Sequence, residues 1–188
     1  MSKSAKNNSV RIIAGDWRGR RLSVANVPGL RPSGDRSRET LFNWLQPFVV
    51  GADCADLFAG TGALGFEAAS RGAASVSFID TDPRAVRSLK ENLSLLASDR
   101  GEVVQSDALA YLQGQPKPFD IIFLDPPFRQ SLLQPCLEQL CNNDWLTTDA
   151  RLYVEVEQEL SEPELPTGWE MIRSKKAGQV IYGLAARC

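Results

Sequence analysis

Four consecutive residues, Asp125-Pro126-Pro127-Phe128, combine an acidic acceptor, a rigid backbone and an aromatic ring. The two prolines fix φ and remove two N–H groups, so the loop presents carbonyl oxygens. The Asp125 carboxylate and the Pro126 carbonyl can both accept hydrogen bonds from one planar –NH2 group, and Phe128 offers a face for stacking a flat base. The loop therefore predicts chemistry on an exocyclic amino group, although a plain proline-rich turn capped by Asp125 is the alternative.

A second loop, within the segment 56–65, is typical of nucleotide binding. Its glycines, Gly60, Gly62 and Gly65, have the G-x-G-x-x-G spacing between an expected strand and an expected helix. Such glycines let the backbone turn sharply and let a ligand approach closely, and the helix N-terminus can hold a carboxylate or phosphate. The residues predicted to contact a cofactor here are Asp56, Phe58, Gly60, Thr61 and Gly62.

Carboxylates also follow the next two expected strands. Asp80 ends the strand after the glycine loop, where a carboxylate can accept both hydroxyls of a ribose. The alternative role for Asp80 is a helix N-cap, for which Asp82 is better placed. Asp107 can accept an exocyclic N–H of adenine or, equally, cap a short helix. Asp80 and Asp107, with their neighbours Thr81 and Ala108, are predicted to contact a nucleoside-bearing cofactor.

Composition limits the choice of chemistry. The 188 residues include no histidine, which excludes histidine-based triads and histidine metal ligands. The four cysteines form no C-x-x-C pair, so we expect neither a zinc site nor a redox dithiol. A nicotinamide dinucleotide is one candidate cofactor, but the expected sheet leaves no chain for a second catalytic domain.

The elements that must position these loops alternate along the chain. From about residue 52, short apolar stretches alternate with amphipathic ones, which predicts a mostly parallel sheet with right-handed crossovers and helices on both faces. The end of the chain predicts an antiparallel hairpin. The expected strands are 54–58, 75–79, 102–105, 119–124 and 152–156, and the expected helices lie near 63–70, after Pro83, and near 109–112 and 131–141.

The first forty residues are strongly basic. They carry nine basic and three acidic side chains, whereas the remainder carries 12 basic and 20 acidic ones. A basic segment on an acidic body predicts contact with a polyanion, although a solvated charge cluster has the same composition. Two glycines, Gly15 and Gly19, between short apolar stretches predict a β-hairpin, and Asp35 is a candidate cap for the helix that follows.

The sequence resembles the class I S-adenosylmethionine methyltransferases that modify exocyclic amino groups. It resembles more closely the RsmD family, the 16S rRNA (guanine-N2)-methyltransferases. The two loops carry the wider resemblance, and three segments point to the family: 11–20, 29–45 and 177–180. The resemblance implies a Rossmann-like α/β sheet with a small N-terminal hairpin and helix, S-adenosylmethionine as cofactor, and methylation of N2 of one guanine in 16S rRNA within a partly or fully assembled small subunit.

The resemblance also implies roles for individual regions. Asp125 and the Pro126 carbonyl would hold the guanine N2 in line with the S–CH3 bond, Phe128 would stack the base, and no metal would be needed. Residues 1–10 are expected to be a flexible tail, 11–50 an RNA-contacting extension and 51–188 the methyltransferase domain. The expected RNA contacts are Arg11, Trp17, Arg18, Arg20, Arg21, Arg31, Arg36 and Arg38, with packing beneath the hairpin slightly favoured for Trp17.

We expect a cytoplasmic protein that does not contact membranes, because the N-terminus lacks the apolar core of a secretory signal and no apolar run approaches about 18 residues. We also expect a monomer. Three other functions stay open. Methylation of adenine N6 in DNA often uses tyrosine in place of Phe128 and an added target-recognition domain. Methylation of a glutamine amide in protein usually uses asparagine in place of Asp125. The third is a non-catalytic nucleotide-binding or ribosome-assembly module.

Overall fold

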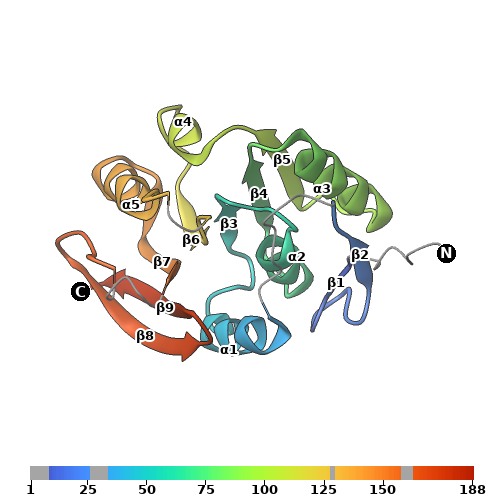
Figure 1. Ribbon diagram of the computed structural model, residues 1–188, viewed down its shortest axis with the longest axis horizontal. Helices are drawn as coiled ribbons and strands as arrows, with labels where there is room; N and C mark the ends of the chain where they lie inside the picture. Colours follow the sequence, from blue (N-terminus) through green and yellow to red (C-terminus); the bar gives the residue numbers. More distant parts are fainter. Residues whose placement is uncertain (1–8, 26–33, 128–129, 158–162) are drawn as a thin grey trace.

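The computed structural model describes residues 9–25, 34–127, 130–157 and 163–188 (Figure 1). Its centre is a seven-stranded sheet with the strand order β5-β4-β3-β6-β7-β9-β8. Neighbouring strands from β5 to β7 are parallel, and β9 is antiparallel to both β7 and β8. The predicted mostly parallel α/β sheet with an antiparallel C-terminal hairpin is therefore confirmed. The strands are β3 (Asp53–Asp56), β4 (Ser75–Asp80), β5 (Gly101–Gln105), β6 (Phe119–Leu124), β7 (Leu146–Glu157), β8 (Trp169–Ala177) and β9 (Val180–Arg187).

Strand β6 is buried on both faces from Ile121 to Leu124, as the apolar run of these four residues predicts. Ile121 and Phe123 belong to the hydrophobic cluster on one face of the sheet, whereas Ile122 and Leu124 belong to the cluster on the other. Because side chains alternate across a strand, this one element supplies both cores.

Helices cover the two faces of the sheet. Residues of α1 (Asp35–Leu45), α2 (Ala63–Ser70) and α3 (Pro83–Leu95) pack in the first cluster, and residues of α4 (Ala108–Leu112) and α5 (Leu133–Asn142) pack in the second (Figure 1). As expected, α3 begins at a proline, where the missing N–H costs nothing. Among the described residues, no helix is long and apolar enough to cross a membrane.

Several element boundaries differ from expectation by one or two residues; for example, β3 ends at Asp56 and not at residue 58. Two differences have a clear structural reason. Strand β7 begins at Leu146, six residues before the predicted start, because Leu146 pairs with Phe119 and the Thr147 hydroxyl donates to Asp120 Oδ1 at 2.9 Å. The polar side chains at positions 147–149 do not indicate a strand, because the start of β7 depends on its pairing with β6. Helix α1 is preceded by Gly34, without a side-chain cap, so Asp35 is its first residue rather than its cap.

The N-terminal extension contains the predicted hairpin. Strands β1 (Ser9–Arg11) and β2 (Arg21–Ser23) pair antiparallel, and Gly15 and Gly19 both have a φ of +82° in the connecting turn. Ser9 and Val10 are thus strand residues, although the expected tail included them. Ile12 and Leu22 are buried in the same cluster as residues of α2 and α3, so the hairpin shares the core of the sheet.

Candidate active site

The loops that follow β3 and β6 begin side by side at one edge of the sheet. Asp56 of β3 lies opposite Phe123 of β6, and the Leu57 N–H donates to the Phe123 carbonyl at 3.2 Å. The glycine loop and the segment Asp125–Pro127 therefore leave the carboxyl ends of neighbouring strands. In strand order this is where the chain reverses direction across the sheet, the usual place for a ligand in open α/β folds.

Asp56 supports the glycine loop from within. Its side chain is 2% exposed and accepts hydrogen bonds from the N–H groups of Gly65, at 3.1 Å, and Phe58. Burial, with a smaller contribution from the charge of Asp80, raises the pKa of Asp56 to about 7. Asp56 thus holds the loop in place, and its predicted contact with a cofactor stays a prediction.

Each glycine of the loop has a separate structural reason. Gly60 and Gly62 have φ values of +50° and +74°, a left-handed conformation that costs little only for glycine. A Cβ on Gly65 would lie 2.3 Å from the Phe78 ring, so this glycine lets α2 approach β4. Thr61 is buried, and its hydroxyl accepts from the Ala63 N–H at 3.3 Å, which completes the turn into the helix.

Asp80 joins the glycine loop to the start of α3. Its Oδ2 accepts from the Gly60 N–H at 2.7 Å, and its Oδ1 accepts from the Asp82 N–H at 2.8 Å. Asp82 caps α3 by accepting from the Arg84 N–H at 2.8 Å, so the capping alternative for Asp80 is wrong. The half-buried Asp80 carboxylate therefore points to the glycine loop, which a ligand would contact.

The remaining predicted cofactor residues lie around this edge. Asp107 caps α4, since its Oδ1 accepts from the Ala110 N–H at 2.8 Å, which confirms the capping role. Phe58 is half-buried against the second hydrophobic cluster, Thr81 is exposed and Ala108 is buried.

Asp125 and Pro126 are half-buried and Pro127 is exposed, whereas Phe128 lies outside the described residues. Asp125 lies near Tyr153 of β7, whose hydroxyl donates to Glu155 Oε2 at 2.7 Å. Burial and the charges of Glu155 and Asp125 raise the pKa of Tyr153 well above its ordinary value. The sequence prediction did not include Glu155, although an acidic residue within an otherwise apolar strand is a signal that points to it.

Most of the predicted RNA-contacting arginines are at the surface. Arg18, Arg20, Arg21 and Arg36 are exposed, and Arg11 is exposed while it pairs with Asp35 at 3.2 Å. Arg31 lies outside the described residues. Trp17 is half-buried against the first hydrophobic cluster, as the packing alternative expects.

Arg38 lies inside the protein, contrary to its predicted place in the RNA interface. It is 2% exposed and donates to Asp35 at 2.7 Å and to the Arg11 carbonyl at 2.9 Å, with Glu67 at 3.7 Å. A buried charge is tolerated when such partners surround it, and these contacts leave the guanidinium unable to reach a phosphate outside. Arg38 is a structural residue.

A contact between the hairpin and α2 was not foreseen. Glu67 is fully buried and accepts from the N–H groups of Ile13, at 2.8 Å, and Ala14, at 3.0 Å, and from Arg71 Nε at 2.8 Å. The Ser70 hydroxyl donates to the Ala14 carbonyl at 2.6 Å. We call this set, Ile13 and Ala14 with Glu67 and Ser70, the hairpin latch.

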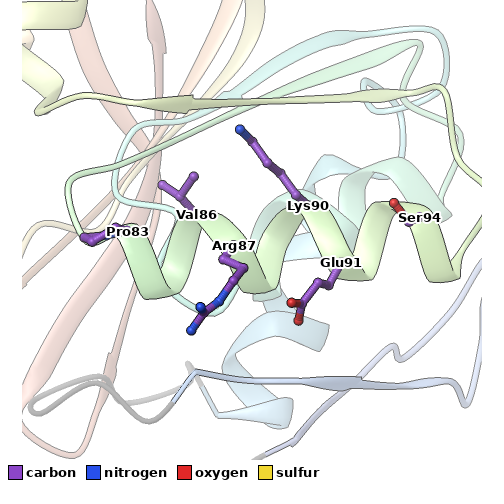
Figure 2. Close-up of a pocket in the computed structure, with 6 residues that line it drawn as sticks. All are labelled: Pro83, Val86, Arg87, Lys90, Glu91 and Ser94. Atoms are coloured by element: carbon purple, nitrogen blue, oxygen red, sulfur yellow. The ribbon is translucent and has the colours of Figure 1, made fainter.

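A groove of about 470 Å³ runs along α3 (Figure 2). Arg87 and Glu91 point to one side of the helix there, and Val86 and Lys90 to the other. The groove contains none of the residues predicted to hold a cofactor, so the candidate site is defined by strand ends and hydrogen bonds instead. Within the described ranges, no three His, Cys, Asp or Glu residues gather in a way that could hold a metal ion.

Comparisons with known proteins agree on one kind of relative. The family model described as conserved hypothetical protein 95 matches residues 10–186. The ribosomal RNA small subunit methyltransferase D of Escherichia coli (strain K12) is 48% identical over 181 residues, which cover 96% of this chain and 91% of that protein. The protein of the same name from Haemophilus influenzae is 47% identical, with 93% and 92% covered. A solved structure named "Putative methyltransferase yhhF from Escherichia coli" is 46% identical with a TM-score of 0.91, and the match covers 96% of this chain and 98% of that one.

Proposed function

The chain belongs to the family of the ribosomal RNA small subunit methyltransferases D, and on that premise we propose that it transfers a methyl group from S-adenosylmethionine to the exocyclic N2 of one guanine in 16S rRNA. We further propose that it acts as a cytoplasmic monomer on a partly or fully assembled small subunit. One observation carries the proposal: the acidic, proline-rich turn at Asp125 and the glycine loop leave neighbouring strand ends at the switch point of the sheet.

The residues at the glycine loop fit this cofactor. Gly60 and Gly62 keep the loop free of side chains, and the half-buried carboxylate of Asp80 is suited to the hydroxyls of a ribose. Asp107 and the backbone at Ala108 would face the adenine. S-adenosylmethionine supplies an electrophilic methyl carbon on a sulfonium.

The chain itself has to place and aim the amino group. Asp125 and the Pro126 carbonyl accept hydrogen bonds from the two N–H groups of N2, and the lone pair of that nitrogen then points toward the methyl group of a cofactor held at the glycine loop. The bound cofactor would supply the methyl group for the new C–N bond and would leave as the neutral sulfide, and Asp125 would accept the proton that the nitrogen loses. Orientation of this kind can contribute up to about 7–11 kcal/mol.

The exposed arginines of the extension supply the contact with RNA. Arg18, Arg20 and Arg21 lie on the hairpin and Arg36 on α1, all on the N-terminal part that packs against α2. Guanidinium groups bind phosphate oxygens strongly. The target base must leave any stacked helix to reach the strand ends, so a loop nucleotide or a flipped base is expected.

The experiment is to incubate the protein with cofactor carrying a tritiated methyl group and with either naked 16S rRNA or small-subunit particles, and then to digest the RNA to nucleosides. We expect label in N2-methylguanosine, at a higher rate with particles. Label in N6-methyladenosine or in protein would contradict the proposal. Binding of the particle without any transfer would favour the assembly module instead.

A further inference from the structure

We propose that Glu155 is a specificity-determining residue, whose carboxylate accepts a hydrogen bond from N1–H of the target guanine, and that Tyr153 positions it. The inference rests on the proposed function, because it assumes that guanine presents N2 to Asp125.

The register of the sheet brings Glu155 beside Asp125. Leu124, the last residue of β6, lies opposite Val154 of β7, and the residues that follow this pair are Asp125, directly after β6, and Glu155 of β7. Neighbouring strands lie about 4.8 Å apart. The two carboxylates therefore lie side by side at the same edge of the sheet as the start of the glycine loop.

Both carboxylates also lie near the side chain of Tyr153, which is on the α1 face of the sheet. Phe123 and Tyr153 form a row of rings with Tyr182 on the α1 face, with centroids 6.3 Å apart at each step. Alternate residues of a strand share a face, so Glu155 lies on the same face as Tyr153. Asp125 comes directly after β6, two residues beyond Phe123. The effect of both carboxylate charges on the Tyr153 hydroxyl is consistent with this placement.

Glu155 has unused hydrogen-bonding capacity. The side chain is half-buried, and Oε2 accepts from the Tyr153 hydroxyl. Within the described parts of the chain, Oε1 forms no hydrogen bond and no lysine or arginine pairs with the carboxylate. Burial raises the pKa of Glu155, and the Tyr153 hydrogen bond opposes this effect. A half-buried carboxylate with one partner is stabilised by a further donor.

Guanine provides that donor beside the reactive group. Its Watson–Crick edge carries N1–H next to the N2 amino group, which matches two neighbouring carboxylates. Adenine carries an acceptor at N1. This acceptor would face the Glu155 carboxylate, which is also an acceptor, so no hydrogen bond could form between them. Selection by an unfavourable contact of this type is a general means of specificity.

The test uses two synthetic RNAs ligated into the substrate, one with guanine and one with 2-aminopurine at the methylated position. 2-Aminopurine keeps the 2-amino group, but its N1 is an acceptor. In E155Q a neutral amide oxygen replaces the charged acceptor for N1–H, so we expect kcat/KM on guanine to fall about 10- to 100-fold. The amide N–H can also donate to the N1 of 2-aminopurine. The preference for guanine over 2-aminopurine should fall at least about 10-fold. An unchanged preference would overturn the inference.

Two further variants keep the test decisive. E170Q makes the same change at an exposed position on β8 and should leave the preference unchanged. Y153F removes only the hydrogen bond that holds Glu155, so the preference should fall about fivefold while cofactor affinity stays the same. If E155Q does not fold, the Y153F preference decides, and an unchanged value there overturns the inference.

The wild-type protein separates this inference from the proposed function. If it forms N2-methylguanosine while E155Q keeps the full preference for guanine, the inference fails and the proposed function stands. If the wild-type product is any other nucleoside, both fail together.

Discussion

The hairpin latch and the strand-end site both depend on buried or half-buried carboxylates, but the protein satisfies them differently. Glu67 in the latch is fully buried and has Arg38, Arg71 and two backbone N–H groups around it. Asp80 at the strand ends accepts only from backbone N–H groups among the described residues. The chain surrounds Glu67 with its own cations, whereas no cation of the described residues pairs with Asp80, and we expect the half-buried Asp80 carboxylate to accept further hydrogen bonds from a ligand.

This contrast predicts that site variants lose activity and keep stability, whereas latch variants lose stability first. The largest effect is expected for Asp125→Ala. Loss of the acceptor for the amino group should lower methyl transfer at least about 100-fold, while calorimetry shows normal cofactor binding. Near-normal turnover would contradict the proposed aiming of the amino group.

Glu67→Ala should have the opposite signature. The change leaves Arg38 buried with one carboxylate partner fewer, and it removes the acceptor for two N–H groups of the hairpin. Breaking a buried pair costs about 3–5 kcal/mol of the free energy of unfolding, which urea denaturation measures. Glu170→Ala, at an exposed position, is the control. Equal stability of the two variants would show that the latch does not hold the hairpin.

Two glycines of the hairpin turn test whether the hairpin packs on α2 at Ser70. Gly15 and Gly19 share a φ of +82°, but a Cβ on Gly15 would lie 1.8 Å from the Ser70 carbonyl oxygen, whereas a Cβ on Gly19 meets nothing within 4 Å. Gly19→Ala should cost about 1–2 kcal/mol from backbone strain. Gly15→Ala should cost about 1–3 kcal/mol more, from the clash. Equal losses would mean that the hairpin turn is not packed on α2 in solution.

The pKa of Asp56 makes a prediction about pH. Its folded-state value of about 7 exceeds the ordinary 3.8, so between these values the folded protein holds a proton that the unfolded chain has lost. Stability due to this group is therefore complete below about pH 4 and is lost as the pH rises toward 7. Asp56→Asn should remove this loss, worth about 1–3 kcal/mol, in urea denaturation at pH 4.5 and 7.5. Parallel pH profiles of the two proteins would refute the assignment.

The smallest effect is expected at the exposed arginines. Arg18→Ala should weaken RNA binding and reduce the log–log salt slope by about 0.7, because one phosphate contact is lost. The control is Arg173→Ala, an exposed arginine on β8. A wild-type affinity that does not change between low and high salt would remove the role proposed for the extension.

Local patterns were sufficient to predict most of the fold. Pro83 after a capping aspartate predicted the start of α3, and the apolar run at residues 121–124 predicted the central strand β6. The early start of β7 could not be predicted, because polar Thr147 pairs only through the neighbouring strand.

The site was predictable only in part. The two loops could be identified from residue types and spacing, but the placement of a side chain that depends on a distant partner could not. Arg38 is drawn inside by Glu67, 29 residues away, so its local sequence predicts a surface charge. Glu155 gains its place beside Asp125 from the β6–β7 register, which the sequence does not specify.

One helix links the two regions. The glycine loop runs directly into α2, and eight residues after Gly62 the same helix ends at Ser70, which holds the hairpin. Cutting the chain near residue 50 would remove Ile12, Leu22 and Phe42 from the hydrophobic cluster to which α2 belongs. It would also leave the Glu67 carboxylate without its backbone donors. An engineer who wished to retarget this protein by grafting another recognition module could not treat residues 51–188 as a self-sufficient unit. The replacement would have to bring its own donors for Glu67.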